Sequence, residues 1–410
     1  MALIKPFVGY LPRPDLAHEI CSPPYDVVNA KEARAIAEAK PNSFMRVIRS
    51  EVDLEPSGDP YAPKVYARAR MNLNRMITGG QLEPAERDSF YIYQLQMGQH
   101  VQTGVVAAIS MEEYAEGKIK KHELTRPDKE NDRTTHILTT KANTGQIFLA
   151  FRSNDRINAL LEEFTQPEPR IHFTAEDGVS HSLWVVNSTD EVHRLTTAFG
   201  AVPSLYIADG HHRTQASLRA WQEKKAEGAP ADSPFAFAMA TLFPSDQLNI
   251  LAYNRVVTDL GDLRPRDVLQ ALETRFEIFE TEDPVPQEKG TFGIYVGHQW
   301  RMIRAKALPE DLPAEKRLDV AILQDQFLGP VLGVTDPRTD PRLEFVGGIH
   351  GISGLEARVA DNPNAMAIAC YPTSMDELLA VADAGSIMPP KSTWFEPKLR
   401  SGLVVRVMES

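Results

Sequence analysis

The sequence predicts a mixed α/β protein, with α+β character and more than one compact substructure. Runs of consecutive apolar residues, which are typical of buried strands, occur at residues 147–151, 205–208 and 365–371. They alternate with segments whose apolar residues recur at helical spacing. The 410 residues exceed one typical hydrophobic core, and 42% hydrophobic with 24% charged residues is an ordinary globular composition.

The composition also limits the expected partners and location. The formal net charge is -12, and nucleic-acid binding requires a basic face. Cys21 and Cys370 are too few and too far apart for a zinc site or a disulfide framework, which fits a reduced, cytoplasmic compartment. The first residues do not resemble a signal peptide, and no apolar run is long enough to span a bilayer. We therefore expect neither nucleic acid nor a membrane as a partner.

The first segment with functional character is Pro23-Pro24-Tyr25-Asp26. Its prolines restrict the backbone and hold the tyrosine and the carboxylate at low entropic cost. A rigid loop that carries a carboxylate suits a general base, so Asp26 is a candidate catalytic residue. The alternative is that Asp26 caps the helix that begins near Ala30.

Regular elements follow this loop. Helices are predicted at residues 31–40 and 62–78, and a strand is predicted at residues 44–48. The apolar runs at residues 90–95 and 101–109 flank a glycine-containing turn, which indicates a β-hairpin.

Residues 118–133 consist almost entirely of ionisable and polar side chains. A helix is predicted to begin at Pro127, because proline is favoured in the first helical turn. On that helix Lys129 and Arg133 are four residues apart and share a face. Together with Arg126 they are candidates to line a pocket for an anion.

His122 and Glu123 precede this helix and have no evident local purpose. We expect them at the entrance of the same pocket, where they are candidate acid–base residues. The alternative is a solvated helix with internal ion pairs, which is the usual meaning of a charge run.

The central motif is Asp209-Gly210-His211-His212-Arg213, which lies between a short apolar run and an amphipathic segment. This order predicts a strand, a tight turn and the start of a helix. Free N–H groups at a helix start favour an anion, and a glycine allows close approach of the backbone. The arginine adds a planar charged group. The alternative is a charged surface turn with ordinary polar histidines.

The rest of the chain contributes fewer candidates. Buried strands are predicted at residues 234–243 and 250–253, and a helix at residues 260–276. A glycine-rich loop at residues 346–351 would permit close approach to a ligand or form a plain turn. Lys391 follows two prolines and is a candidate phosphate ligand, the alternative being a lysine on a surface turn.

These residues fit phosphoryl transfer better than other chemistries. The chain has no Walker loop, dinucleotide fingerprint, zincin motif or nucleophile elbow. It does have positive groups and helix-start N–H donors beside candidate bases, which phosphoryl transfer requires. A magnesium ion held by one or two carboxylates is expected. Asp209 is the candidate ligand and also a candidate catalytic residue.

The chain is similar to a broad bacterial and archaeal family, the domain of unknown function 1015. The similarity covers most of the sequence and rests on residues 23–26, 122–133, 208–213, 346–351 and 389–393. The central motif also resembles the strand–turn–helix signature of the ParB/sulfiredoxin-like fold, whose turn binds nucleotide or pyrophosphate. Proteins with that fold include free serine kinases, which phosphorylate L-serine with ADP, ATP or pyrophosphate.

This resemblance implies a ParB/sulfiredoxin-like core with additional N- and C-terminal α/β substructures. We expect a catalytic region at residues 1–280 and a C-terminal α/β subdomain packed on it at residues 281–410. The resemblance implies a phosphate role for the turn, at Gly210, His211, His212 and Arg213. The serine kinases use an N-terminal carboxylate as the base, and Asp26 and Glu123 both remain candidates for it.

The expected function is therefore that of a kinase for the hydroxyl group of a small metabolite. Free L-serine is the expected acceptor, and pyrophosphate or an adenine nucleotide is the expected donor. Two other functions remain open, a nucleotide-binding regulator of the ParB type and a phosphatase of a phosphorylated metabolite. A small-molecule substrate is the expected partner, and the sequence is compatible with a homodimer.

Overall fold

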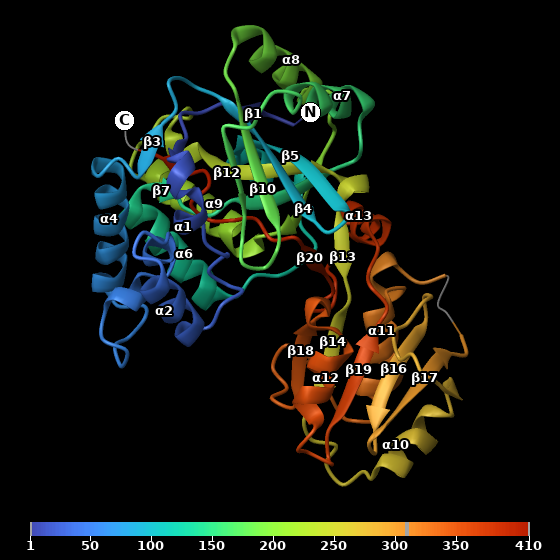
Figure 1. Ribbon diagram of the computed structural model, residues 1–410. Helices are drawn as coiled ribbons and strands as arrows, with labels where there is room; N and C mark the ends of the chain where they lie inside the picture. Colours follow the sequence, from blue (N-terminus) through green and yellow to red (C-terminus); the bar gives the residue numbers. More distant parts are fainter. Residues whose placement is uncertain (1, 308–310, 409–410) are drawn as a thin grey trace. The chain divides into compact units, whose positions relative to one another are not determined.

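The computed structural model describes residues 2–307 and 311–408, which form two compact units (Figure 1). The first unit comprises Met1–Leu248 and Pro397–Ser410, and the second comprises Asn249–Glu396. The division lies at Leu248 and not at the predicted residue 280. The reason is that β14 (Tyr253–Val257), part of an apolar stretch assigned to the first region, pairs with strands of the second sheet.

The first unit is built on a nine-stranded mixed sheet, which agrees with the predicted mixed α/β class. Its spatial order is β6–β11–β8–β12–β5–β4–β10–β9, and β1 pairs with β5. The strands are β1 (Ile4–Lys5), β4 (Phe90–Met97), β5 (His100–Ser110), β6 (Ile119–Lys120), β8 (Ile147–Phe151), β9 (Ile171–Thr174), β10 (Ser180–Val186), β11 (Leu205–Asp209) and β12 (Phe237–Pro244). Every residue of β8 and β12 is buried, as consecutive apolar residues predict.

Strand direction places the central motif at an edge region of this sheet. β11 is parallel to the short β6 and antiparallel to β8, while β8 is parallel to β12. The remaining pairs in the sheet are antiparallel, including the predicted hairpin of β4 and β5. The segment after β6 and the turn after β11 therefore lie at the same end of two neighbouring parallel strands.

Helices complete the first unit. They are α1 (Ala17–Ile20), α2 (Ala30–Ala39), α3 (Met45–Ile48), α4 (Pro63–Thr78), α5 (Met111–Ala115), α6 (Pro127–Thr140), α7 (Asp155–Phe164), α8 (Thr189–Phe199) and α9 (His211–Ala226). α6 packs against both α4 and α9, and α7 packs beside α8 (Figure 1). α6 begins at Pro127, as predicted. None of the helices within residues 2–307 and 311–408 has the length and apolar character needed to cross a bilayer.

The predicted strand at residues 44–48 is wrong. Met45–Ile48 forms the short helix α3, and Phe44, Met45, Val47 and Ile48 are buried in one apolar cluster with residues of α2 and α4. Strand propensity describes how a side chain fits a half-buried sheet surface, and here packing against two helices overrides it.

The last segment of the chain belongs to the first unit. Ser22 and Ser401 exchange main-chain hydrogen bonds at 3.0 and 2.9 Å. Further along, β21 (Arg406–Val407) pairs with β7 (Ala142–Asn143). A separate two-stranded ladder joins β2 (Tyr10–Pro12) to β3 (Leu82–Pro84). The C-terminal segment is thus fixed beside the predicted Asp26 loop, which follows Ser22.

The second unit contains a six-stranded antiparallel sheet of order β15–β17–β16–β19–β14–β18. Its other strands are β15 (Phe276–Glu280), β16 (Thr291–Val296), β17 (Gln299–Ala305), β18 (Leu343–Gly347) and β19 (Met366–Cys370). Its helices are α10 (Pro265–Leu272), α11 (Asp319–Leu323), α12 (Gly351–Val359) and α13 (Met375–Asp383). The chain enters through β13 (Asn249–Leu251) and leaves through β20 (Trp394–Glu396), which pair with each other.

Two features of the second unit differ from the sequence-based expectations. The helix predicted at residues 260–276 is shorter, because the chain after α10 forms β15. The glycine-rich loop after β18 makes its close backbone approach within the protein. A Cβ atom at Gly347 would lie 2.6 Å from the Trp394 ring, and one at Gly348 would lie 2.7 Å from the Ala252 carbonyl oxygen. Internal packing therefore explains these glycines.

Candidate active site

The central motif forms the predicted strand, turn and helix. β11 ends at Asp209, Gly210 has φ 96°, and α9 begins at His211. The first main-chain hydrogen bond at this end of α9 runs from the Thr214 N–H to the Gly210 carbonyl at 2.9 Å. The three N–H groups before Thr214 precede the intrahelical ladder, so the helix start presents donors suited to an anion.

Arg213 lies directly over the turn. A Cβ atom at Gly210 would be 2.9 Å from the Arg213 Nε atom, so the absence of a side chain makes room for the guanidinium. The Arg213 side chain is 11% exposed, and its Nε atom has no hydrogen-bond partner within the described part of the chain. A buried donor without a partner indicates a group that a ligand could satisfy.

Two cations hold Asp209. Lys398 Nζ donates to Asp209 Oδ2 at 3.1 Å, and Arg213 Nη2 lies 3.8 Å from Asp209 Oδ1. Burial alone would raise the pKa of Asp209, but the charges of Lys398 and Arg213 hold it well below its usual range. A carboxylate with such a low pKa is a weak base at neutral pH. The geometry thus gives Asp209 a role in holding two cations, which differs from the predicted catalytic role.

Sequence reasoning missed Lys398. It lies in the segment that returns from the second unit, and 189 positions separate it from Asp209. A lysine in a loop near the C-terminus carries no sequence signal for this contact. The predicted lysine, Lys391, lies in the second unit, where its ammonium is 5.6 Å from the Tyr253 ring centroid.

The two histidines of the motif hold the loop that precedes α6. The His122 main-chain N–H donates a long hydrogen bond to His211 Nε2 at 3.4 Å. The Arg126 main-chain N–H donates to His212 Nε2 at 3.1 Å. Since His211 Nε2 accepts, the proton of the neutral ring lies on Nδ1, which is 3.7 Å from Glu123 Oε2. The structure therefore brings the loop before α6 and the central motif together.

His122 lies beneath this contact and is 1% exposed. Its ring meets the His211 ring edge-on, with centroids 4.5 Å apart. Neither ring nitrogen of His122 makes a well-formed hydrogen bond to any described residue. Burial lowers the pKa of His122 and of His211 to about 3 each, so both rings are neutral at pH 7. Such weak bases are poor proton acceptors, and this arrangement does not favour His122 as the general base.

The cations predicted to line one anion pocket do not share it. Arg126 is exposed and pairs with Asp128 at 2.9 Å, while Lys129 donates to the Tyr61 hydroxyl at 3.0 Å. Arg133 pairs with Asp132 at 2.8 Å. Each of the three side chains binds a different residue. This arrangement is closer to the alternative interpretation, a helix with local ion pairs.

Arg133 instead supports the loop that carries Asp26. Its guanidinium lies 4.2 Å from the Tyr25 ring centroid, and Arg49 Nη1 donates to the carbonyls of Tyr25 and Val28 at 3.0 and 2.8 Å. The alternative role of Asp26 as a helix cap is excluded, because the Asn29 side chain caps α2. Asp26 is exposed, which leaves its carboxylate available to a ligand.

The charge of Asp26 acts on the central motif. Burial would lower the pKa of Arg213, but the carboxylates of Asp26 and Asp209 together hold it above its usual range. The charge of Asp26 thus favours the protonated form of Arg213. The loop with Asp26, the loop with Glu123, the helix start and Lys398 converge on one region of the first unit.

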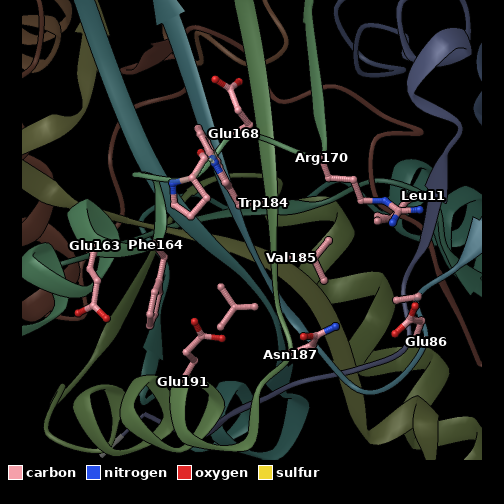
Figure 2. Close-up of a pocket in the computed structure, with 13 residues that line it drawn as sticks. Leu11, Glu86, Glu163, Phe164, Glu168, Arg170, Trp184, Val185, Asn187 and Glu191 are labelled. Atoms are coloured by element: carbon pink, nitrogen blue, oxygen red, sulfur yellow. Dashed lines mark hydrogen bonds between the residues drawn. The ribbon is translucent and has the colours of Figure 1, made fainter.

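A separate pocket of about 460 Å³ lies elsewhere in the first unit (Figure 2). Phe164 and Trp184 contribute apolar surface to it, and the charged residues that line it are Glu86, Glu163, Glu168, Glu191 and Arg170. The excess of carboxylates disfavours a phosphate there. None of the predicted site residues lines this pocket.

Residues 4–321 match the family model described as "Protein of unknown function (DUF1015)". The chain belongs to this family. The part of this DUF1015 protein that matches includes Asp26, Glu123 and the central motif, and it ends before Lys398. No curated protein sequence matches the chain significantly.

Several solved structures are similar to part of this DUF1015 protein. SbnI with a C-terminal truncation from Staphylococcus aureus has 13% identity and a TM-score of 0.38, covering 74% of this chain and 87% of its own. A free serine kinase in complex with AMP has 15% identity and a TM-score of 0.35, with coverages of 71% and 86%. A conserved hypothetical protein from Pyrococcus furiosus has 14% identity and a TM-score of 0.34, with coverages of 74% and 95%. TM-scores this low do not support the transfer of an activity.

The predicted magnesium ligand does not fit its surroundings in this DUF1015 protein. Both carboxylate oxygens of Asp209 face cations. Within residues 2–307 and 311–408 there is also no group of three His, Cys, Asp or Glu side chains that could hold a metal ion. A hard divalent cation prefers several oxygen ligands, so these residues would not hold magnesium by themselves.

Proposed function

We propose that the protein is a phosphotransferase that moves a phosphoryl group from pyrophosphate or an adenine nucleotide to the hydroxyl group of a small metabolite. Free L-serine is the acceptor proposed on the resemblance of the motif to that of the serine kinases. The observation that carries the proposal is the start of α9. There, three helix-start N–H groups and the buried Arg213 surround a glycine turn, and Arg213 Nε has no partner among the described residues.

The groups at this turn match the needs of a transferred phosphoryl group. Negative charge is spread over its oxygens during transfer, and fixed N–H donors and a guanidinium stabilise that charge. The Arg213 guanidinium remains protonated at any physiological pH, since its pKa is held above the usual range by the carboxylates of Asp26 and Asp209. Its planar fork suits two phosphate oxygens at once.

The proposed reaction is a direct displacement at phosphorus. The acceptor hydroxyl oxygen forms a bond to the terminal phosphorus, and the bond from that phosphorus to the bridging oxygen of the donor breaks. The leaving group is phosphate or the shortened nucleotide. The proton of the hydroxyl passes to a carboxylate of the protein, and the helix start and Arg213 hold the transferred group.

We assign the proton acceptor to Asp26. Its carboxylate is exposed, and its charge favours the protonated form of Arg213, the proposed phosphate ligand. Glu123 faces His211 Nδ1 at 3.7 Å and is better suited to orient that ring. Asp209 is bound by two cations, and its low pKa makes it a weak base.

A direct assay tests the proposal. The purified protein is incubated with L-serine, Mg²⁺ and either pyrophosphate, ADP or ATP, and phosphoserine is followed by phosphorus NMR. We expect product with at least one donor, and a loss of at least tenfold, about 1.4 kcal/mol of barrier, in Arg213→Ala. Asp26→Asn should lower kcat with little effect on the KM of the donor.

Controls separate the proposal from its rivals. Lys225→Met removes a surface ion pair with Glu112 and should leave the rate unchanged. If the protein hydrolyses the donor or phosphoserine and transfers no phosphoryl group to an acceptor, its activity is that of a phosphatase and not of a kinase. Absence of turnover with every donor and with a panel of small hydroxyl compounds would refute the proposed function.

A further inference from the structure

The segment that returns from the second unit supplies a cation to the site. β20 ends at Glu396, and Lys398 follows two residues later with its ammonium on Asp209 Oδ2 at 3.1 Å. The Lys398 side chain is 17% exposed, so it is largely buried beside the turn. The family match ends at residue 321 and does not include it.

Several contacts fix this segment in place on the first unit. The Arg400 main-chain N–H donates to the Tyr93 hydroxyl, and Arg400 Nε donates to His181 Nε2, both at 3.2 Å. The Arg400 guanidinium also pairs with Asp177. Tyr93 and His181 are fully buried in β4 and β10. The central sheet therefore holds Arg400, which lies two residues after Lys398.

The same segment also lies beside the Asp26 loop and beside Arg213 of the central motif. Ser401 exchanges main-chain hydrogen bonds with Ser22, four residues before Asp26. A Cβ atom at Gly145 would lie 3.6 Å from Arg213 Cδ and 3.9 Å from Ser401 Oγ, so Arg213 and Ser401 border the same small space. The C-terminal segment thus contacts Ser22, just before the Asp26 loop, and also the central motif and the sheet.

We propose that Lys398 is a positioning residue of the phosphate site, which fixes Asp209 and through it Arg213 and adds a positive charge beside the α9 start. This inference rests on the proposed function. In this arrangement the Lys398 ammonium orients the Asp209 carboxylate through Oδ2. Asp209 in turn holds Arg213 through its second oxygen, and the two cations flank one carboxylate.

The test measures binding of inorganic pyrophosphate by calorimetry and, separately, the KM of the donor. Lys398→Met should bind pyrophosphate at least tenfold more weakly and raise the KM of the donor by a similar factor. The KM of serine should stay within about twofold. Lys398→Arg should retain affinity within about threefold, because it keeps the charge. Lys225→Met is the matched control, since it removes another lysine paired with a carboxylate in the first unit.

A double variant separates positioning from charge balance. Lys398→Met/Asp209→Asn removes both charges of the pair, so that the Asp209 carboxylate is not left without its lysine partner. If Lys398 positions the phosphate site, the double variant binds pyrophosphate as weakly as Lys398→Met. Recovery of wild-type affinity in the double variant would show that Lys398 only neutralises Asp209, and would overturn the inference. So would wild-type affinity in Lys398→Met, or an equal loss in Lys225→Met.

The two proposals fail in different ways. Pyrophosphate binding that depends on Lys398, without transfer to any acceptor, refutes the phosphotransferase and supports the role of Lys398 in anion binding. Transfer with an unchanged donor KM in Lys398→Met supports the phosphotransferase and refutes the role of Lys398. If the folded wild-type protein binds neither pyrophosphate nor a nucleotide, both proposals fail.

Discussion

The Arg126 main-chain N–H donates a hydrogen bond to His212 Nε2 at 3.1 Å, across 86 positions of sequence. The neighbouring His211 makes the corresponding contact to the main chain of His122. The two histidines therefore hold the loop at residues 122–126 against the start of α9 through these hydrogen bonds. Their Nε2 atoms are occupied by these bonds, so the predicted phosphate role of the two rings would have to use Nδ1.

His212→Ala should loosen that loop. One hydrogen bond of this kind contributes about 0.5–1.5 kcal/mol to the free energy of unfolding. We expect faster hydrogen exchange at the Arg126 amide and a lower kcat, while the KM of the donor changes less. Exchange measured by NMR tests this, with His193→Ala as the control because His193 is exposed on α8. Unchanged exchange at Arg126 would show that the hydrogen bond to His212 does not order the loop.

Gly210→Ala tests the close approach of Arg213 to the turn. Gly210 has φ 96°, which costs a residue with a Cβ atom about 1–2 kcal/mol, and the new methyl group would lie 2.9 Å from Arg213 Nε. Gly228 is a matched control, since it has φ 92° and no atom within 4 Å of its Cβ position. We expect both variants to lose similar stability in denaturant titrations.

The two glycine variants should differ in phosphate binding. Gly210→Ala displaces the guanidinium and should weaken pyrophosphate binding at least tenfold, whereas Gly228→Ala should bind normally. If both variants bind like the wild-type protein, Arg213 does not depend on this contact.

Arg213→Lys tests whether the planar arrangement of donors in the guanidinium contributes to activity in addition to its positive charge. A lysine keeps one positive charge but loses the planar arrangement of donors, and the Nε group over Gly210 is removed. We expect kcat/KM to fall by about tenfold in Arg213→Lys and further in Arg213→Ala. Equal values for the two variants would mean that the positive charge contributes nothing without the guanidinium geometry, whereas a fully active Arg213→Lys would assign the role to charge alone.

The local part of the site was predictable from sequence. The strand, turn and helix around Gly210 depend on apolar spacing and on a glycine between them, which are properties of neighbouring residues. The joining of the loop at residues 122–126 to the motif was not a prediction from the sequence. The contacts that make this joining, from His211 and His212 to main-chain N–H groups, depend on the parallel pairing of β6 with β11.

The nonlocal part was not predictable. Lys398 reaches Asp209 because the chain returns from the second unit and is anchored by Arg400, and no residue pattern near Lys398 encodes this. The charge run after Pro127 suggested a shared anion pocket, but Asp128 and Asp132 pair with the arginines locally. Short-range ion pairs form whenever partners are adjacent, and sequence spacing alone does not distinguish them from a binding site.

Buried histidines should make the protein sensitive to acid. Burial lowers the pKa of His136 to about 4, below the ordinary value of 6.5, and its Nε2 lies 3.0 Å from the Val47 carbonyl oxygen. As pH falls below about 6.5, the unfolded chain binds a proton that the folded protein excludes. The stabilising contribution is therefore complete above pH 6.5 and is lost as pH falls toward 4.

His136→Gln removes this titration and can still donate a hydrogen bond to Val47. Between pH 6 and pH 4 the free energy of unfolding of the wild-type protein should therefore fall more steeply than that of the variant, by up to about 1.4 kcal/mol per pH unit. Denaturant titrations across this range measure both slopes. His193→Gln, at an exposed position, should follow the wild-type curve. Parallel curves for the wild-type protein and His136→Gln would show that His136 is protonated in the folded protein, against the expectation from its burial.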